Sequence, residues 1–319
     1  MRHLLITAAA LAMPTLAIAE VDCGNDITKT AEAVLTIKTP EQFNAPIVEA
    51  AAVETVQQVA PEAIETAPQT VQLAQVQPSS AKTYSSVEAS PVAAYSKLLQ
   101  KRISRGQGGL NLFDYAGANA DGELKTITAY TDHLAGQNPD IMSQADQIAY
   151  WANLYNALTL KVVLENYPVS SIRKIKSGTF KPGPWDRDAV TVNGKVLTLN
   201  DIEHGIMRKN YPNPAMVHYM VNCASIGCPN LGDKVWVGAT LDKDREQAAR
   251  DFINSPRGVA IDGADLEVSS IYNWFKEDFG GSKSTTLEHI RKFAGPNLRA
   301  ALDAGAKIDG YNYNWDLNE

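Results

Sequence analysis

A histidine and two cysteines lie close together in one stretch of the chain. His218 precedes Cys223, and Cys228 ends the short segment Cys-Ala-Ser-Ile-Gly-Cys that begins at Cys223. A histidine near a thiol can lower the pKa of the thiol and make the nucleophilic thiolate available near neutral pH. The pattern therefore predicts a thiol-dependent hydrolase or acyl transferase, with Cys223 as the nucleophile and His218 as the base.

The same cysteines are open to two other interpretations. Thiols of exported proteins tend to oxidise, and Cys223 and Cys228 are spaced so that a disulfide would close a small loop between them. The protein would then be a non-catalytic envelope binding module whose bridge shapes a recognition loop. Alternatively, His218 and the two cysteines, joined by Glu203 or His204, form a conceivable metal site, although their spacing matches no zinc signature.

Two asparagines and a glutamate are candidates for orienting the His218 ring. Asn153 and Asn156 are three residues apart on a predicted helix, so they project from neighbouring parts of its surface. Each amide could instead satisfy buried backbone groups of an adjacent loop. Glu203 stands three residues after Asn200 in the pattern of a capping box, so we expect it to act mainly as a helix cap.

Further polar residues near these positions complete the set of candidates. His204 and Arg208 are four residues apart on the same short predicted helix, and they share a face that points either to the site or to solvent. His218 could also be a core histidine whose ring nitrogens are satisfied by neighbours. Ser225 and Cys228, in the cysteine segment, are the remaining site candidates.

These candidates fall on a few well-marked elements. The strongest helix begins after Ser143, which can cap it, and keeps an apolar period of 3.6 residues up to Asn166-Tyr167-Pro168. Two alternating runs on either side of Asn193-Gly194 predict a type I′ β-hairpin. The apolar run at 216–223 predicts a central strand that carries His218.

Helices and strands alternate along residues 91–319 without a regular βαβ rhythm. Ser90-Pro91 begins the first helix of this region, and further helices are predicted over 201–209, 241–253 and 270–279. We therefore expect an α+β fold, in which several helices of one compact domain pack on a small, mostly antiparallel sheet.

Several long sequence blocks resemble the DUF547 family, in which blocks of this kind occur in the same order. The three principal blocks are 147–159, 199–208 and 218–231, and two further similar segments are 270–280 and 313–318. The resemblance covers roughly residues 91–319 and requires several blocks in order, which makes it specific. It implies a family whose chemistry is undetermined, and together with the amino-terminal sequence described next we expect an exported bacterial member.

The amino terminus has the three parts of a secretory signal peptide. Met1-Arg2-His3 is followed by an apolar stretch up to Leu16 and by the small-residue site Ala17-Ile18-Ala19. This stretch is shorter than the ~20 residues that span a bilayer, and a proline interrupts it, so we expect cleavage before Glu20 rather than anchoring. Without residues 1–19, the mature protein would be soluble and either periplasmic or secreted.

Residues 20–90 have the composition of a disordered acidic spacer. They are rich in Ala, Val, Thr, Gln, Pro and Glu and contain few aromatic residues, so a packed core is hard to build from them. Cys23 lies in this spacer as the third cysteine, and it could pair between chains. The expected organisation is a signal peptide at 1–19, the spacer at 20–90 and a folded domain at 91–319.

Charge and motifs exclude several classes of function. The net charge of −7 resides mainly in the spacer, so the folded domain is nearly neutral and has no basic footprint for nucleic acid or anionic lipid. Gly-rich phosphate loops and the Gly-x-Ser-x-Gly and His-Glu-x-x-His motifs are absent from the sequence, which disfavours nucleotide enzymes, serine hydrolases and zincins. We expect no cofactor. No segment after the signal peptide predicts a membrane span, and the expected partner is a small-molecule or peptide ligand.

Overall fold

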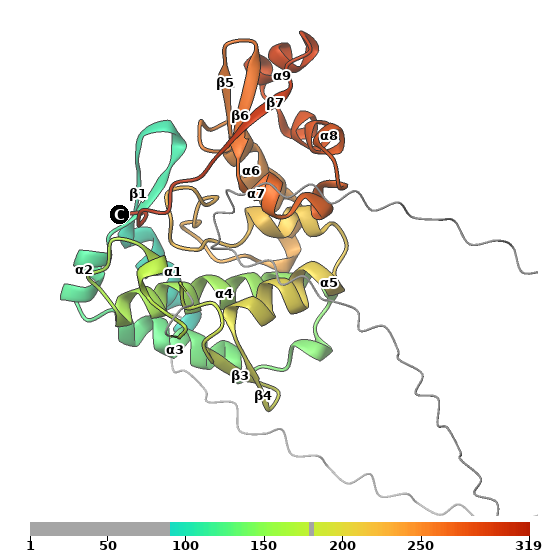
Figure 1. Cartoon of the computed structure of the whole chain (residues 1–319). Coiled ribbons are helices and arrows are strands. Elements are labelled where there is room, and N and C mark those ends of the chain that lie inside the picture. The colour runs from blue at the N-terminus through green and yellow to red at the C-terminus, as the bar shows by residue number, and fades with distance from the viewer. Residues whose placement is uncertain (1–89, 179–181) are drawn as a thin grey trace, which may run out of the picture. The chain divides into compact units, whose positions relative to one another are not determined.

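The computed structural model describes residues 90–178 and 182–319 (Figure 1). The predicted signal peptide, Cys23 and all of the predicted spacer before Ser90 lie outside the described residues. Among the helices of the described ranges, none combines the length and the apolar character needed to cross a membrane.

Helices around the long central helix α4 make up the first half of the domain (Figure 1). Ser90 accepts a hydrogen bond from Ala93 N at the start of α1, and Ser143 accepts one from Asp146 N at the start of α4, so both predicted caps are confirmed. Most of α4 is buried, because α3 packs along it and the short helices at 201–207 and 238–240 lie against it. These helices are α1 Pro91–Arg102, α2 Tyr115–Ala120, α3 Leu124–Ala135 and α4 Gln144–Glu165.

Within residues 90–178 and 182–319, three small sheets accompany the helices, which confirms the predicted α+β class. The strands pair as β1–β2, β3–β4 and β5–β6–β7, so the sheet structure is divided rather than gathered into one sheet. All pairs are antiparallel except β6 and β7, which run parallel. The strands are β1 Ile103–Arg105, β2 Asn111–Phe113, β3 Val190–Val192, β4 Lys195–Leu197, β5 Val259–Asp262, β6 Asp265–Ser269 and β7 Ile308–Asn312.

The β3–β4 hairpin confirms the turn predicted from Asn193-Gly194. Val192 pairs with Lys195, which leaves a loop of two residues between the strands. Both loop residues have positive φ angles, 48° at Asn193 and 76° at Gly194. This is the backbone of a type I′ turn, and Asn-Gly suits it because both residues tolerate the left-handed region.

Two hydrophobic cores lie on either side of the short 3₁₀ helix η6, Pro214–Tyr219. The first core is centred on α1, α3 and α4, and the second is formed by the β5–β6–β7 sheet with the helices between residues 241 and 303. Val217 belongs to the first core and Tyr219 to the second, so His218 lies at the boundary between them. The helices of the second half are α5 Arg208–Asn210, α6 Leu241–Ile253, α7 Ile271–Trp274, α8 Lys283–Phe293 and α9 Pro296–Asp303.

The predicted strand at 216–223 is wrong. The chain forms η6 here and then continues to Cys223 without regular structure. Asn213 turns the chain with a φ of 60°, and Pro214 at the first helical position favours helical over extended backbone. The run is apolar on all sides because it lies between two cores, and periodicity alone cannot distinguish such a buried helical turn from a central strand.

The carboxyl-terminal segment returns from β7 to the first half of the domain (Figure 1). Phe113 N donates a hydrogen bond to Asn318 O at 2.8 Å, next to the β1–β2 hairpin. Ile226 N donates to Asp316 O at 2.9 Å. The segment therefore runs along the loop that joins the two cysteines.

Candidate functional site

His218 is held in a buried network of charged side chains. Its side chain is 2% exposed, and its ring stacks on Phe275 with the ring centroids 4.4 Å apart. The ring atom Nε2 lies 2.7 Å from Oδ2 of Asp278. Because an ionised carboxylate can only accept, His218 Nε2 carries the proton and donates it. Asp278 comes from the 3₁₀ helix η8, Lys276–Phe279, so η6 and η8 together form the pair.

Arg208 binds the same carboxylate. Its Nε donates to Oδ2 of Asp278 at 2.6 Å, and its Nη2 donates to Oδ1 at 3.1 Å. Burial alone raises the pKa of Asp278, but the hydrogen bonds from His218 and Arg208 outweigh burial and lower this pKa from 3.8 to about 2. Asp278 is therefore ionised at neutral pH and fixes the orientation of the His218 ring.

Glu203 faces the opposite nitrogen of the His218 ring. Its Oε1 is 3.9 Å from His218 Nδ1 and 3.8 Å from His204 Nδ1, and both distances exceed that of a hydrogen bond. The Glu203 side chain is only 9% exposed, yet no hydrogen bond reaches its carboxylate from the residues that the structure describes. The Glu203 carboxylate lines a cavity, so water or a ligand could supply the missing donor.

Glu203 lies on a π-helix, η5 (Asp201–Met207), rather than on the predicted α-helix. The Arg208 backbone N–H donates to the Glu203 carbonyl five residues earlier, which is the π spacing. Single turns of π-helix are rare and are found frequently at functional sites.

The predicted capping box between Asn200 and Glu203 is wrong. The Asn200 side chain makes no capping hydrogen bond. Instead, Asp201 N donates to Thr198 Oγ1 at 3.0 Å, and Thr198 N donates to Asp201 Oδ2 at 3.0 Å. The capping box therefore begins two residues earlier than predicted, and the Glu203 carboxylate is available for the interior.

His204 and Arg208 share one face, as their spacing predicts, and that face turns inward. Arg208 Nη1 lies 3.2 Å from His204 Nδ1, and the His204 side chain is 20% exposed. Burial lowers the pKa of His204, and the nearby Glu203 carboxylate offsets this only in part. His204 is therefore neutral at pH 7, and its Nδ1 accepts from Arg208, since a guanidinium can only donate.

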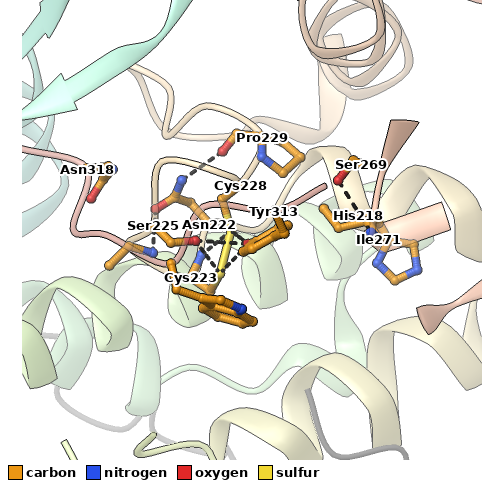
Figure 2. Close-up of a disulfide and its surroundings, with 12 residues drawn as sticks. His218, Asn222, Cys223, Ser225, Cys228, Pro229, Ser269, Ile271, Tyr313 and Asn318 are labelled. Atoms are coloured by element: carbon orange, nitrogen blue, oxygen red, sulfur yellow. Dashed lines mark hydrogen bonds between the residues drawn. A yellow bond between two sulfur atoms is a disulfide. The ribbon is translucent and has the colours of Figure 1, made fainter. Parts of the chain in front are cut away.

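Cys223 and Cys228 form a disulfide (Figure 2). The Tyr313 hydroxyl lies 3.1 Å from each sulfur, and Ser225 Oγ lies 2.9 Å from that hydroxyl. The Cys223 backbone N–H donates to Cys228 Sγ at 3.0 Å. Of the three interpretations of these cysteines, the structure contains the disulfide. No group of three or more His, Cys, Asp or Glu side chains within the described ranges is arranged to hold a metal ion.

Asn156 anchors the loop that carries the cysteines. Its Oδ1 accepts from Asn222 N at 2.8 Å, and its Nδ2 donates to Met220 O at 2.9 Å. Asn222 in turn accepts from Ala224 N and donates to Pro229 O, as Figure 2 shows. Ala224 has a φ of 59°, a strained value for a residue with a Cβ, and these hydrogen bonds hold it there.

Asn153 binds loop backbone and does not orient His218. Its Nδ2 donates to Trp236 O at 2.9 Å, and its Oδ1 accepts from Trp236 N at 2.8 Å. Both helix asparagines therefore satisfy buried backbone groups of adjacent loops, which was the alternative interpretation of their spacing. Asp278 and Glu203 are the residues that flank the imidazole.

The main candidates meet around one cavity of about 40 Å³, called here the aromatic cavity. Glu203, His218 and the disulfide line it, whereas His204 and Arg208 are not among its lining residues. The rest of its wall is mostly aromatic: Tyr155, Trp185, Trp274, Phe275, Tyr313 and Trp315. A few polar groups that converge in an apolar wall are typical of a ligand site.

Sequence reasoning missed Asp278 and Tyr313 as site residues. Both lie in segments that resemble the family, 270–280 and 313–318, and this was the available signal. Asp278 is one of two adjacent acids and stands 60 residues from His218, so the sequence does not indicate which acid pairs with the ring.

Comparison with known proteins covers the central part of this site. Residues 139–253 match the family model described as "Protein of unknown function, DUF547". The matched segment contains Glu203, His218 and both cysteines, whereas Asp278 and Tyr313 lie beyond it. No curated protein and no solved structure matches the chain. This segment, which holds α4, η5 and η6, supports the assignment of the chain to the DUF547 family.

Proposed function

We propose that the domain is a hydrolase or group transferase whose acid–base group is the Glu203 carboxylate in the aromatic cavity. The observation that carries the proposal is that this carboxylate is nearly buried, lines the cavity and has no hydrogen-bond donor among the described residues. A carboxylate that the protein leaves without a donor at the wall of a cavity can exchange a proton with water or a ligand there. The predicted signal peptide supports a periplasmic or secreted location for this activity.

Glu203 has a definite role in this proposal. Its carboxylate accepts a proton from a water molecule or a hydroxyl group, whose oxygen attacks an electrophilic carbon of the substrate. The same carboxyl group then returns the proton to the departing oxygen or nitrogen, so the proton count balances. A cavity of about 40 Å³ has room for water and for the end of a ligand.

His218 is a positioning residue in this scheme. Asp278 holds the proton of the ring on Nε2, so the ring presents Nδ1 to Glu203 at 3.9 Å. Arg208 keeps Asp278 ionised, and the Phe275 ring stacks on the His218 ring and covers one of its faces. This chain of contacts fixes the imidazole beside Glu203, which is the kind of support that an acid–base group requires.

The geometry supports Glu203 better than Cys223 as the reactive group. A thiol mechanism requires a free Cys223 and a ring nitrogen of His218 that is directed at its sulfur. In the structure the sulfur is bonded to Cys228, and the two ring nitrogens of His218 face Asp278 and Glu203.

The aromatic wall of the cavity indicates the class of substrate. Indole and phenol rings present flat apolar surfaces, which bind the faces of sugar or aryl rings. Trp274 stacks near Trp315, with ring centroids 5.6 Å apart and planes 25° apart. We therefore expect a substrate that places a ring against these side chains and an ester, amide or glycosidic bond near Glu203.

A panel of chromogenic aryl esters, amides and glycosides tests the proposal. Glu203→Gln should lose turnover by about 10²-fold or more, the usual contribution of a general acid–base group. Glu165→Gln is the matched control, because Glu165 lies at the exposed end of α4 and pairs only loosely with Lys161 at 4.0 Å. Turnover that is unchanged in Glu203→Gln would exclude Glu203 as the acid–base group.

A second candidate function is a non-catalytic binding module, which is favoured by the closed disulfide in the wall of a small aromatic cavity. The same panel separates the candidates. A binding module would show quenching of tryptophan fluorescence by a ligand, with no turnover and with equal affinity in Glu203→Gln. Turnover that appears only after reduction, and is lost in Cys223→Ser, would instead support the thiol mechanism.

A further inference from the structure

We propose that the Cys223–Cys228 disulfide exchanges with dithiols, with Cys223 as the sulfur that is attacked and Cys228 as the sulfur that leaves. This exchange is separate from the proposed acid–base function, because it requires neither Glu203 nor the substrate on which Glu203 would act. It rests on the hydrogen bonds to the two sulfurs, on their unequal burial and on the anchoring of the loop between them.

A backbone N–H donates to Cys228 Sγ and not to Cys223 Sγ. This donor is the Cys223 N–H at 3.0 Å, whereas the Tyr313 hydroxyl lies 3.1 Å from both sulfurs and the Ser225 hydroxyl lies 3.3 Å from Cys223 Sγ. Ser225 Oγ, at 2.9 Å, can donate to the Tyr313 oxygen and so leave the phenolic proton for the sulfur. Donors of this kind stabilise a thiolate, and a thiol leaves a disulfide faster when its thiolate is more stable.

The two sulfurs differ in their access to solvent. Cys228 is 5% exposed and belongs to the buried residues, whereas Cys223 is only partly buried. Exchange needs an approach to the sulfur that is attacked, so access favours Cys223. The hydrogen bonds and the burial therefore assign the same direction to the reaction.

The loop between the cysteines is held in place independently of the disulfide. Gly227 N donates to Asn314 O at 2.8 Å, and Ile226 N donates to Asp316 O at 2.9 Å. The Asn222 side chain fixes the beginning of the loop by accepting from Ala224 N at 2.8 Å. After reduction these contacts keep the two sulfurs adjacent, so opening the disulfide should leave the fold intact.

The exchange balances with the dithiol as the only co-reactant. A thiolate of the dithiol bonds to Cys223 Sγ, the bond between Cys223 and Cys228 breaks, and its electron pair goes to Cys228 as a thiolate. The second thiolate of the dithiol then attacks the dithiol sulfur that is bonded to Cys223. This closes a disulfide within the dithiol and releases Cys223 as a thiolate. The dithiol is oxidised by two electrons, and the two cysteines are reduced.

Glutathione identifies the attacked sulfur, because this monothiol leaves a mixed disulfide that can be trapped by acid quench. Peptide mapping of the mature wild-type chain distinguishes Cys223, Cys228 and Cys23. We expect glutathione on Cys223, with Cys228 as the newly alkylated thiol. Glutathione on Cys228, or a disulfide that resists millimolar dithiothreitol in the folded protein, would overturn the proposal.

The rate of reduction by dithiothreitol tests the role of Tyr313. Tyr313→Phe removes one donor to the leaving sulfur and should slow reduction about fivefold, the factor expected for one hydrogen bond. Tyr311→Phe is the control, because Tyr311 lies on β7 two residues away and has no sulfur contact among the described residues. Equal rates for Tyr313→Phe and the wild type, or loss of far-ultraviolet dichroism on reduction, would refute the exchange mechanism.

Discussion

Replacing Asp278 by asparagine should destabilise the domain by an amount that follows from its pKa. Asparagine has the shape of a protonated aspartate but cannot ionise, so the variant resembles the neutral form of Asp278. The pKa of Asp278 falls from 3.8 to about 2 on folding, because the hydrogen bonds from His218 and Arg208 outweigh burial. A difference of this size corresponds to about 2 kcal/mol in the free energy of unfolding at pH 7.

The same linkage gives the pH dependence of this effect. A pKa that is depressed in the folded state stabilises the protein above the unfolded pKa, near 3.8, and this contribution is lost as the pH falls through the folded pKa of about 2. The difference between the wild type and Asp278→Asn should therefore shrink to about 1 kcal/mol at pH 3.

Urea unfolding at pH 7, 5 and 3, followed by tryptophan fluorescence, measures both quantities. Asp242→Asn is the matched control, because Asp242 is 81% exposed and its ion pair with Arg245 is a surface pair worth less than about 1 kcal/mol. A loss below about 0.5 kcal/mol in Asp278→Asn at pH 7, or a loss that stays constant down to pH 3, would refute the electrostatic argument.

Three further outcomes follow from the sequence and the structure. Asn153→Ala should lower the free energy of unfolding by about 2–4 kcal/mol in urea denaturation, because it leaves both backbone groups of Trp236 without partners; a loss below 1 kcal/mol would argue against this anchor. Gly227→Ala should lower the free energy of unfolding by about 1–3 kcal/mol in the same assay, since a Cβ there would lie 2.9 Å from Asn314 N. Wild-type stability of this variant would mean that the carboxyl-terminal segment can shift to make room at little cost. Intact-mass analysis of the exported protein should place the mature amino terminus at Glu20, and retention of the first residue would contradict the signal peptide.

Local signals in the sequence predicted much of the fold. The caps Ser90 and Ser143, the Asn193-Gly194 turn and the period of α4 depend on neighbouring residues, and the structure confirms all of them. The strand predicted at 216–223 is wrong because the packing of two cores around this segment, and not its own backbone conformation, determines which residues are apolar. A segment between two cores is apolar on every side whatever its backbone conformation, so the pattern could not identify η6.

Some residues of the cavity could be selected from the sequence, but their partners could not. His218, Glu203 and the two cysteines do line one cavity. The partners of the imidazole could not be predicted, because Asp278 reaches it from a separate 3₁₀ helix and Glu203 is turned inward by a π-helix. Such pairings depend on how distant segments pack, and local sequence periodicity contains no information about those contacts.

The most direct test of the account is the steady-state kinetics of Glu203→Gln on a substrate turned over by the wild type. Glutamine preserves the size of the side chain, and the aromatic wall that binds the ring is untouched. We predict that kcat falls about 10²-fold or more while KM stays within about threefold, because a transition-state role has been removed and ground-state binding has not. An unchanged kcat, or a loss confined to KM, would contradict the assignment of Glu203 as the acid–base group.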